Sequence, residues 1–109
     1  FENNESDIVT NILIRSFPKG QSVEVINCNT FLAHYGNLSS KEDFEHVTRY
    51  FYNNFNSFNI LNLKNDKDLS SVNLAVDKRK DYQKVSKIIC NLEKKHYEYS
   101  LNDIIRKNN

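Results

Sequence analysis

The stretch SSKEDFEHVTRYFYNNFNSF, residues 39–58, carries the strongest core signal of the sequence. Its large apolar side chains recur at steps of three and four residues, which is the spacing of one helix face. They are Phe44, Val47, Phe51, Phe55 and Phe58. Ser39 and Glu42 have the spacing of a capping box, in which two side chains satisfy free backbone N–H groups at a helix start. The stretch predicts a capped helix with one aromatic face towards the core.

The residues before this stretch predict a helix and then extended chain. Apolar residues at helical spacing, from Ile8 to Leu13, predict a helix over residues 5–17, which Pro18 ends. Residues 22–35 are instead rich in β-branched and aromatic side chains. We therefore expect one long strand or a bent pair of strands there.

Two short strands and two helices are predicted after residue 58. In the first strand, residues 60–63, Leu61 and Leu63 share one face and Ile60 and Asn62 share the other. In the second strand, residues 72–76, Val72, Leu74 and Val76 share one face, and the polar turn 64–68 would join the two strands as a hairpin. A long helix is expected over residues 78–97. Its apolar seam consists of Tyr82, Val85, Ile89, Leu92, His96 and Tyr99. The capping box from Ser100 to Asp103 predicts a short last helix.

The expected fold class is α+β. The order α-β(β)-α-β-β-α-α predicts a small two-layer domain with helices packed on a mainly antiparallel sheet. A length of 109 residues fits a single domain, residues 1–109. Because the chain begins with Phe1 and contains no Met, we expect it to have been excised from a longer protein.

Composition favours a soluble chain without a nucleotide-binding glycine loop. Fifteen Lys and Arg nearly balance 14 Asp and Glu, and no apolar run approaches the ~18 residues that span a bilayer, so we expect no membrane insertion. An intracellular location, cytoplasmic or nuclear, is favoured. Only two glycines are present, which excludes phosphate-loop and dinucleotide motifs and weighs mildly against catalysis. The 17 asparagines follow a bias towards AT-rich codons and carry no functional signal.

The candidate binding residues are lysines of the predicted 78–97 helix and two tyrosines. Lys80, Lys84, Lys87, Lys94 and Lys95 lie opposite the apolar seam and would form a solvent-facing cationic ridge. Such a ridge is either an ordinary solvated face or a site for phosphates or an acidic partner. Tyr50 and Tyr52 either flank the aromatic core or stack on nucleic-acid bases.

Cysteines and histidines give no defensible site. Cys28 and Cys90 match no metal spacing, and their apolar neighbours predict buried thiols, with a disulfide as the alternative. Glu42 and His46 share a helix face, but no third ligand is spaced to join them. We expect no metal, no cofactor and no catalytic residue.

The leading hypothesis is a non-catalytic protein–protein interaction or assembly module of a larger protein. An apolar patch would hold a protein partner, and the lysine ridge would steer acidic surfaces towards it. The alternatives are a nucleic-acid-binding module that uses the ridge, and a small enzyme built on Cys28 or Cys90 with a histidine. Homo-oligomerisation through the helix seam is a further option. No stretch carries a motif specific enough to name a family.

Overall fold

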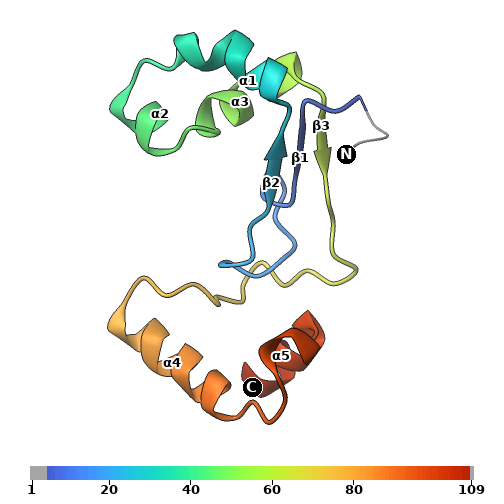
Figure 1. Ribbon diagram of the computed structural model, residues 1–109, viewed down its shortest axis with the longest axis vertical. Helices are drawn as coiled ribbons and strands as arrows, with labels where there is room; N and C mark the ends of the chain where they lie inside the picture. The colour runs from blue at the N-terminus through green and yellow to red at the C-terminus, as the bar shows by residue number, and fades with distance from the viewer. Residues whose placement is uncertain (1–4, 109) are drawn as a thin grey trace.

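A three-stranded mixed sheet joins two helical regions in the computed structural model, which describes residues 5–108 (Figure 1). The strands are β1 (Ile8–Thr10), β2 (Glu24–Ile26) and β3 (Ile60–Asn62), in the order β2-β1-β3. β1 pairs antiparallel with β2 and parallel with β3. The central β1 therefore has its backbone groups paired on both edges.

Helices lie at both ends of the sheet (Figure 1). One end carries α1 (Cys28–His34), α2 (Lys41–Glu45) and α3 (Arg49–Asn53), with 3₁₀ turns at Tyr35–Asn37 and Phe55–Ser57. The other end carries α4 (Arg79–Cys90), a 3₁₀ turn at His96–Glu98 and α5 (Leu101–Asn108). These helices and the small sheet confirm the α+β class, whereas the order of elements differs from the predicted one.

The aromatic core gathers around Phe51, which is fully buried. Its ring lies 5.0 Å from that of Phe58 and 6.2 Å from that of Phe31, between centroids. Phe44 and Phe55 are 65% and 51% exposed, so the prediction of one continuous aromatic face was wrong. The predicted helix is broken after α2, at His46, and again after α3, at Asn54, so Phe44 and Phe55 lie outside the helix that carries Phe51.

Side-chain caps set the boundaries of the first helices. The capping box lies one residue later than predicted, because the Asp43 N–H donates to the Ser40 hydroxyl and the Ser40 N–H donates to the Asp43 carboxylate. Asn27 follows the last residue of β2 and is the N-cap of α1, since its side-chain oxygen accepts from the N–H groups of Asn29 and Thr30. The predicted long strand over 22–35 is thus a three-residue strand followed by α1.

The predicted helix over residues 5–17 is absent, and β1 with a following loop occupies its place. Ile8, Val9 and Thr10 are all β-branched, which favours a strand, and their backbone groups pair with β2 on one edge and with β3 on the other. The expected hairpin between 60–63 and 72–76 is also wrong. β3 pairs with β1, and in the second segment Asn73 forms an isolated bridge with Lys19.

α4 is shorter than the predicted 78–97 helix and ends at Cys90. The hydroxyl of Tyr99 accepts from the backbone N–H groups of Glu93 and Lys94, which holds a turn where the helix was expected to continue. Tyr82 and Ile89 of the predicted seam are 64% and 59% exposed, and the buried face contains Ile88 instead. The predicted last helix is confirmed as α5.

No helix within residues 5–108 is long and apolar enough to cross a membrane.

Candidate functional site

The candidate site lies where the turn around Lys19 meets the segment that leads into α4. The Lys19 N–H donates to the Val72 carbonyl at 2.9 Å, and the Leu74 N–H donates to the Lys19 carbonyl at 2.8 Å. These two bonds make one rung of parallel β-structure between segments far apart in sequence. The turn is thereby fixed beside the N-terminus of α4.

Gly20 makes this close approach possible. Its φ is +98°, a backbone conformation that residues other than glycine rarely adopt. A Cβ at this position would lie 2.6 Å from the backbone nitrogen of Ala75. The turn therefore requires glycine for its conformation and for the space against the second segment.

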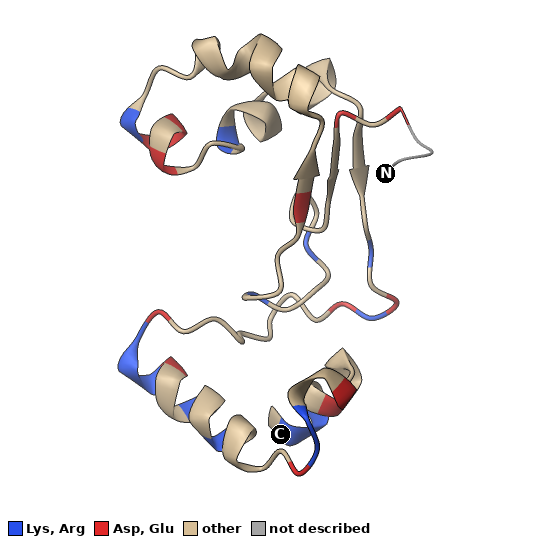
Figure 2. Ribbon diagram, in the orientation of Figure 1, with Lys and Arg blue, Asp and Glu red and all other residues tan. Residues whose placement is uncertain are grey.

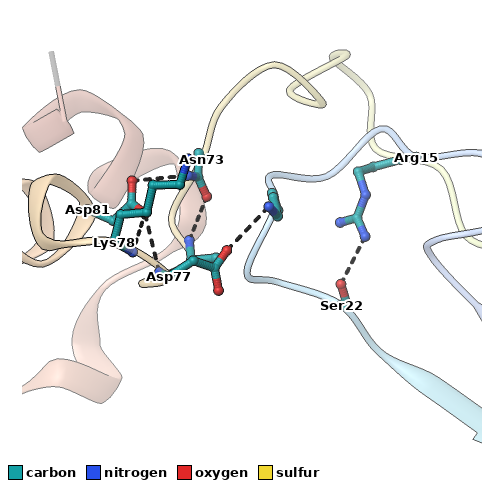
Figure 3. A network of polar contacts seen from close by, with 8 residues as sticks. Arg15, Ser22, Asn73, Asp77, Lys78 and Asp81 are labelled. Atoms are coloured by element: carbon teal, nitrogen blue, oxygen red, sulfur yellow. Dashed lines mark hydrogen bonds and ion pairs between the residues drawn. The ribbon is translucent and has the colours of Figure 1, made fainter. Parts of the chain in front are cut away.

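Lys19 and Asp77 form an ion pair across this junction, with 3.3 Å between the Lys19 Nζ and Asp77 Oδ2 (Figure 3). Their side chains are 59% and 60% exposed, so both charges remain accessible to a ligand. Arg15 adds a second cation: its guanidinium donates to the Pro18 carbonyl at 3.3 Å and to the Ser22 hydroxyl at 3.1 Å. We call Arg15, Lys19, Ser22 and Asp77 the basic-turn site.

Asp81 positions the α4 side of this site (Figure 3). Its carboxylate accepts from the N–H groups of Lys78 at 2.9 Å and Asp77 at 3.2 Å, and from the Asn73 amide at 3.4 Å. The bond from the Lys78 N–H is the main cause that lowers the pKa of Asp81 below its ordinary value. The side chain is only 8% exposed, so it serves as a helix cap, whereas Asp77 faces solvent.

The basic-turn site has the groups needed to hold an anion. Arg15 and Lys19 both belong to the loop between β1 and β2, and arginine and lysine side chains are the groups that commonly bind phosphate. The Asp77 carboxylate is an oxygen ligand of the kind that divalent cations such as Mg²⁺ bind. Within residues 5–108, no group of three His, Cys, Asp or Glu side chains could hold a metal ion by itself.

The predicted lysine ridge is divided by the end of α4. Lys80, Lys84 and Lys87 lie on α4, whereas Lys94 and Lys95 lie in the turn after it (Figure 2). Lys84 is half-buried and donates to the Asn73 carbonyl at 2.7 Å, so it does not extend into solvent. A binding role for these lysines stays a prediction.

A hollow of about 1150 Å³ lies between α4 and α5. Lys84, Lys87 and Lys107 are among its lining residues. Lys107 donates to the Asn91 carbonyl at 2.8 Å, and Lys84 is bonded as described above, so both amines already have partners.

The two predicted tyrosines belong to the packing around α3. The Tyr52 hydroxyl donates to the Glu24 carboxylate at 2.6 Å and lies 3.0 Å from the Thr10 hydroxyl. Tyr50 packs edge-on against Phe51, with 5.4 Å between ring centroids. These contacts favour the structural interpretation of both tyrosines, and base stacking stays untested.

The cysteines differ from the expectation of burial, because Cys28 and Cys90 are both exposed free thiols. Cys28 begins α1 and Cys90 ends α4. Among residues 5–108, neither thiol forms a hydrogen bond with a histidine. The structure thus gives no geometric support to a cysteine–histidine pair.

Sequence reasoning missed the basic-turn site. The sequence predicted only that Pro18 ends a helix, and it gave no role to Lys19 or Asp77. The available signal was Asp81, an acidic residue in the first turn of the helix and three residues after Lys78, where its carboxylate can accept from the N-cap N–H. Nothing local to the sequence indicated that the turn and the cap would meet.

Comparison with known proteins supplies a similarity of fold. No family model and no curated protein matches this chain. It is similar to the solved structure of a cytidylyltransferase from Leptospira borgpetersenii serovar Hardjo-bovis (strain JB197), with a TM-score of 0.86 and 24% sequence identity. The match covers 97% of this chain and 44% of that chain. The chain therefore spans less than half the length of the cytidylyltransferase that it matches.

This similarity corrects the functional hypothesis drawn from the sequence. A neighbour that is an enzyme contradicts the interpretation as a non-catalytic interaction module, and with it the expectation that the chain is not part of an enzyme. The scarcity of glycine was a poor argument against catalysis. One of the two glycines, Gly20, lies at the turn where the structure requires it.

Proposed function

We propose that this chain is part of a nucleotidyltransferase that transfers a cytidylyl group, and that its basic-turn site contacts the triphosphate of the nucleotide. The observation that carries the proposal is the fold shared with a cytidylyltransferase over 97% of the chain at a TM-score of 0.86. The activity would belong to the complete enzyme, of which this chain supplies one part.

The proposed chemistry is attack by an acceptor oxygen on the α-phosphorus of CTP. A bond forms between the acceptor oxygen and that phosphorus, while the bond from the same phosphorus to the bridging oxygen breaks. Pyrophosphate leaves with the electron pair, and the acceptor's proton passes to water. Phosphoryl chemistry of this kind depends mainly on positioning and on stabilising negative charge.

The basic-turn site is suited to both tasks. Lys19 would place a positive charge beside the triphosphate, and its ion pair with Asp77 restricts where the ammonium lies. Arg15 bonds the carbonyl and hydroxyl on either side of the turn, so it keeps the turn closed and adds charge. The Lys19 side chain is 59% exposed, so its ammonium would contact the nucleotide while it stays beside Asp77.

Two expectations from the sequence accompany this proposal untested. An intracellular location stays a prediction, and it agrees with the use of a nucleoside triphosphate. A homo-oligomeric state also stays a prediction.

Isothermal titration calorimetry of the purified chain with CTP tests the proposed function. We expect saturable binding that pyrophosphate competes away and that is tighter for CTP than for ATP or GTP. Lys19→Ala should weaken CTP binding about tenfold, which corresponds to roughly 1.4 kcal/mol. Lys41→Ala, at the start of α2 in the other helical region (Figure 1), is the matched control and should leave the affinity unchanged. No saturable CTP binding, or equal losses in both variants, would overturn the proposal.

A further inference from the structure

One face of the sheet consists of exposed aliphatic side chains. The register places Val25 and Leu61 on either side of Val9, so the three share one face. Val23 and Leu63 extend this face, because the Asn11 N–H donates to the Val23 carbonyl and the Leu63 N–H donates to the Thr10 carbonyl. We call these five residues the aliphatic face.

The opposite face is covered within the chain. Ile8 and Thr10, which point away from Val9, are fully buried. Tyr52 of α3 reaches this side and bonds Thr10 and Glu24. By contrast, four members of the aliphatic face are 41–55% exposed, and only the central Val9 is shielded by its neighbours, at 9%.

Such exposure is unusual for this kind of sheet. Parallel pairs such as β1–β3 normally occur in sheets with both faces covered, because the connections between parallel strands place helices on each face. Contiguous exposed apolar side chains generally mark a contact surface. The aliphatic face contains no charged residue, so it fits an apolar occupant.

The size of the chain's surface agrees with a missing occupant. Its accessible area is 8227 Å² at 12.8 kDa, whereas a self-contained protein of this mass exposes about 6,300 Å². Its radius of gyration is 16.7 Å, against about 13 Å for a compact domain of this length. The excess of about 1,900 Å² is spread over an elongated chain, and it is larger than the ~800 Å² that one partner buries in a standard interface.

We infer that the aliphatic face packs against an amphipathic helix from the part of the cytidylyltransferase fold that this chain does not span. The match covers 44% of the neighbour's chain, so the larger part of that fold is available to supply the helix. This inference goes beyond the proposed function: it rests on the shared fold and needs neither CTP nor the basic-turn site.

Co-expression tests this inference. The chain would be produced together with the unmatched part of the Leptospira cytidylyltransferase, as two polypeptides, and the product analysed by light scattering. We expect a 1:1 complex. Val25→Asp and Leu61→Asp should each weaken it at least tenfold, because each places a charge against the apolar side of the helix.

Leu32→Asp on α1 is the matched control, since Leu32 is 63% exposed but lies outside the aliphatic face, and it should leave the complex intact. Circular dichroism should show all three variants folded like the unmodified chain. Absence of a 1:1 complex, equal complex formation by every variant, or a homodimer that the Val25 and Leu61 substitutions dissociate would each overturn the inference. CTP binding does not enter this readout, so failure here and failure of the proposed function are distinguishable.

Discussion

Gly20 lies so close to Ala75 that a Cβ on the glycine would be 2.6 Å from the alanine's backbone nitrogen. This approach joins the turn that carries Lys19 to the segment that leads into α4. The local conformation at Gly20 is therefore the condition on which the basic-turn site depends.

Gly20→Ala should destabilise the chain, because the new side chain would have to occupy a positive φ and displace the backbone of residues 74–75. We expect a loss of about 1–3 kcal/mol in the free energy of unfolding, measured by urea denaturation. Gly36→Ala is the matched control, since its Cβ would meet nothing within 4 Å. Its effect should stay below about 1 kcal/mol. Equal effects of both substitutions would contradict the assigned role of Gly20.

Tyr52→Phe should cost about 1 kcal/mol, because it removes the hydroxyl that bonds Glu24 and Thr10 at the half-buried edge of the sheet. Tyr50→Phe removes only a 3.3 Å bond from the exposed Asn37 amide and should cost less than about 0.5 kcal/mol. Urea denaturation of the two variants compares them directly. A larger loss for Tyr50→Phe would contradict this account.

The same tyrosine should make the chain sensitive to high pH. Burial, followed by the hydrogen bond to Glu24, raises the pKa of Tyr52 above its ordinary value near 10. Because the folded state holds the proton more tightly, this contribution to stability is complete below about pH 10 and is lost as the pH rises further. Ultraviolet titration should show one tyrosine that ionises after the others, and Tyr52→Phe should abolish that late step. Its persistence in the variant would assign it elsewhere.

Asp81→Asn should weaken the start of α4, because an amide is a poorer acceptor than a carboxylate for the N–H groups of Lys78 and Asp77. Those bonds lower the pKa of Asp81, so the stabilisation is present above the ordinary aspartate value near 4 and is lost as the pH falls below it. The denaturation midpoint should therefore depend less on pH below 4 in the variant. Asp66→Asn, at an exposed position in a loop, should leave the pH dependence unchanged.

Elements with complete local signals could be predicted from the sequence. The two-residue spacing of Leu61 and Leu63 predicted β3, and both side chains are similarly exposed, at 41% and 44%. The Ser100–Asp103 capping box identified α5, where the Asp103 N–H donates to the Ser100 hydroxyl. In both cases the residues that decide the structure lie within a few positions of one another.

Elements that depend on distant partners could not be predicted in this way. Residues 8–10 form a strand because residues 24–26 and 60–62 pair with them, and their apolar spacing also suited a helix. The basic-turn site could not be predicted from the sequence for the same reason. Lys19 and Asp77 are separated by about half of the chain and meet only once the fold is formed.

The central claim is that the basic turn contacts the nucleotide, and nuclear magnetic resonance of the ¹⁵N-labelled chain during CTP titration tests it most directly. The account predicts amide shifts concentrated at residues 15–22 and 77–79, on the two sides of the Lys19–Asp77 pair. These shifts should be reduced in Lys19→Ala and retained in Lys41→Ala. Shifts concentrated instead along Lys87, Lys94 and Lys95, or no shifts at saturating CTP, would contradict it.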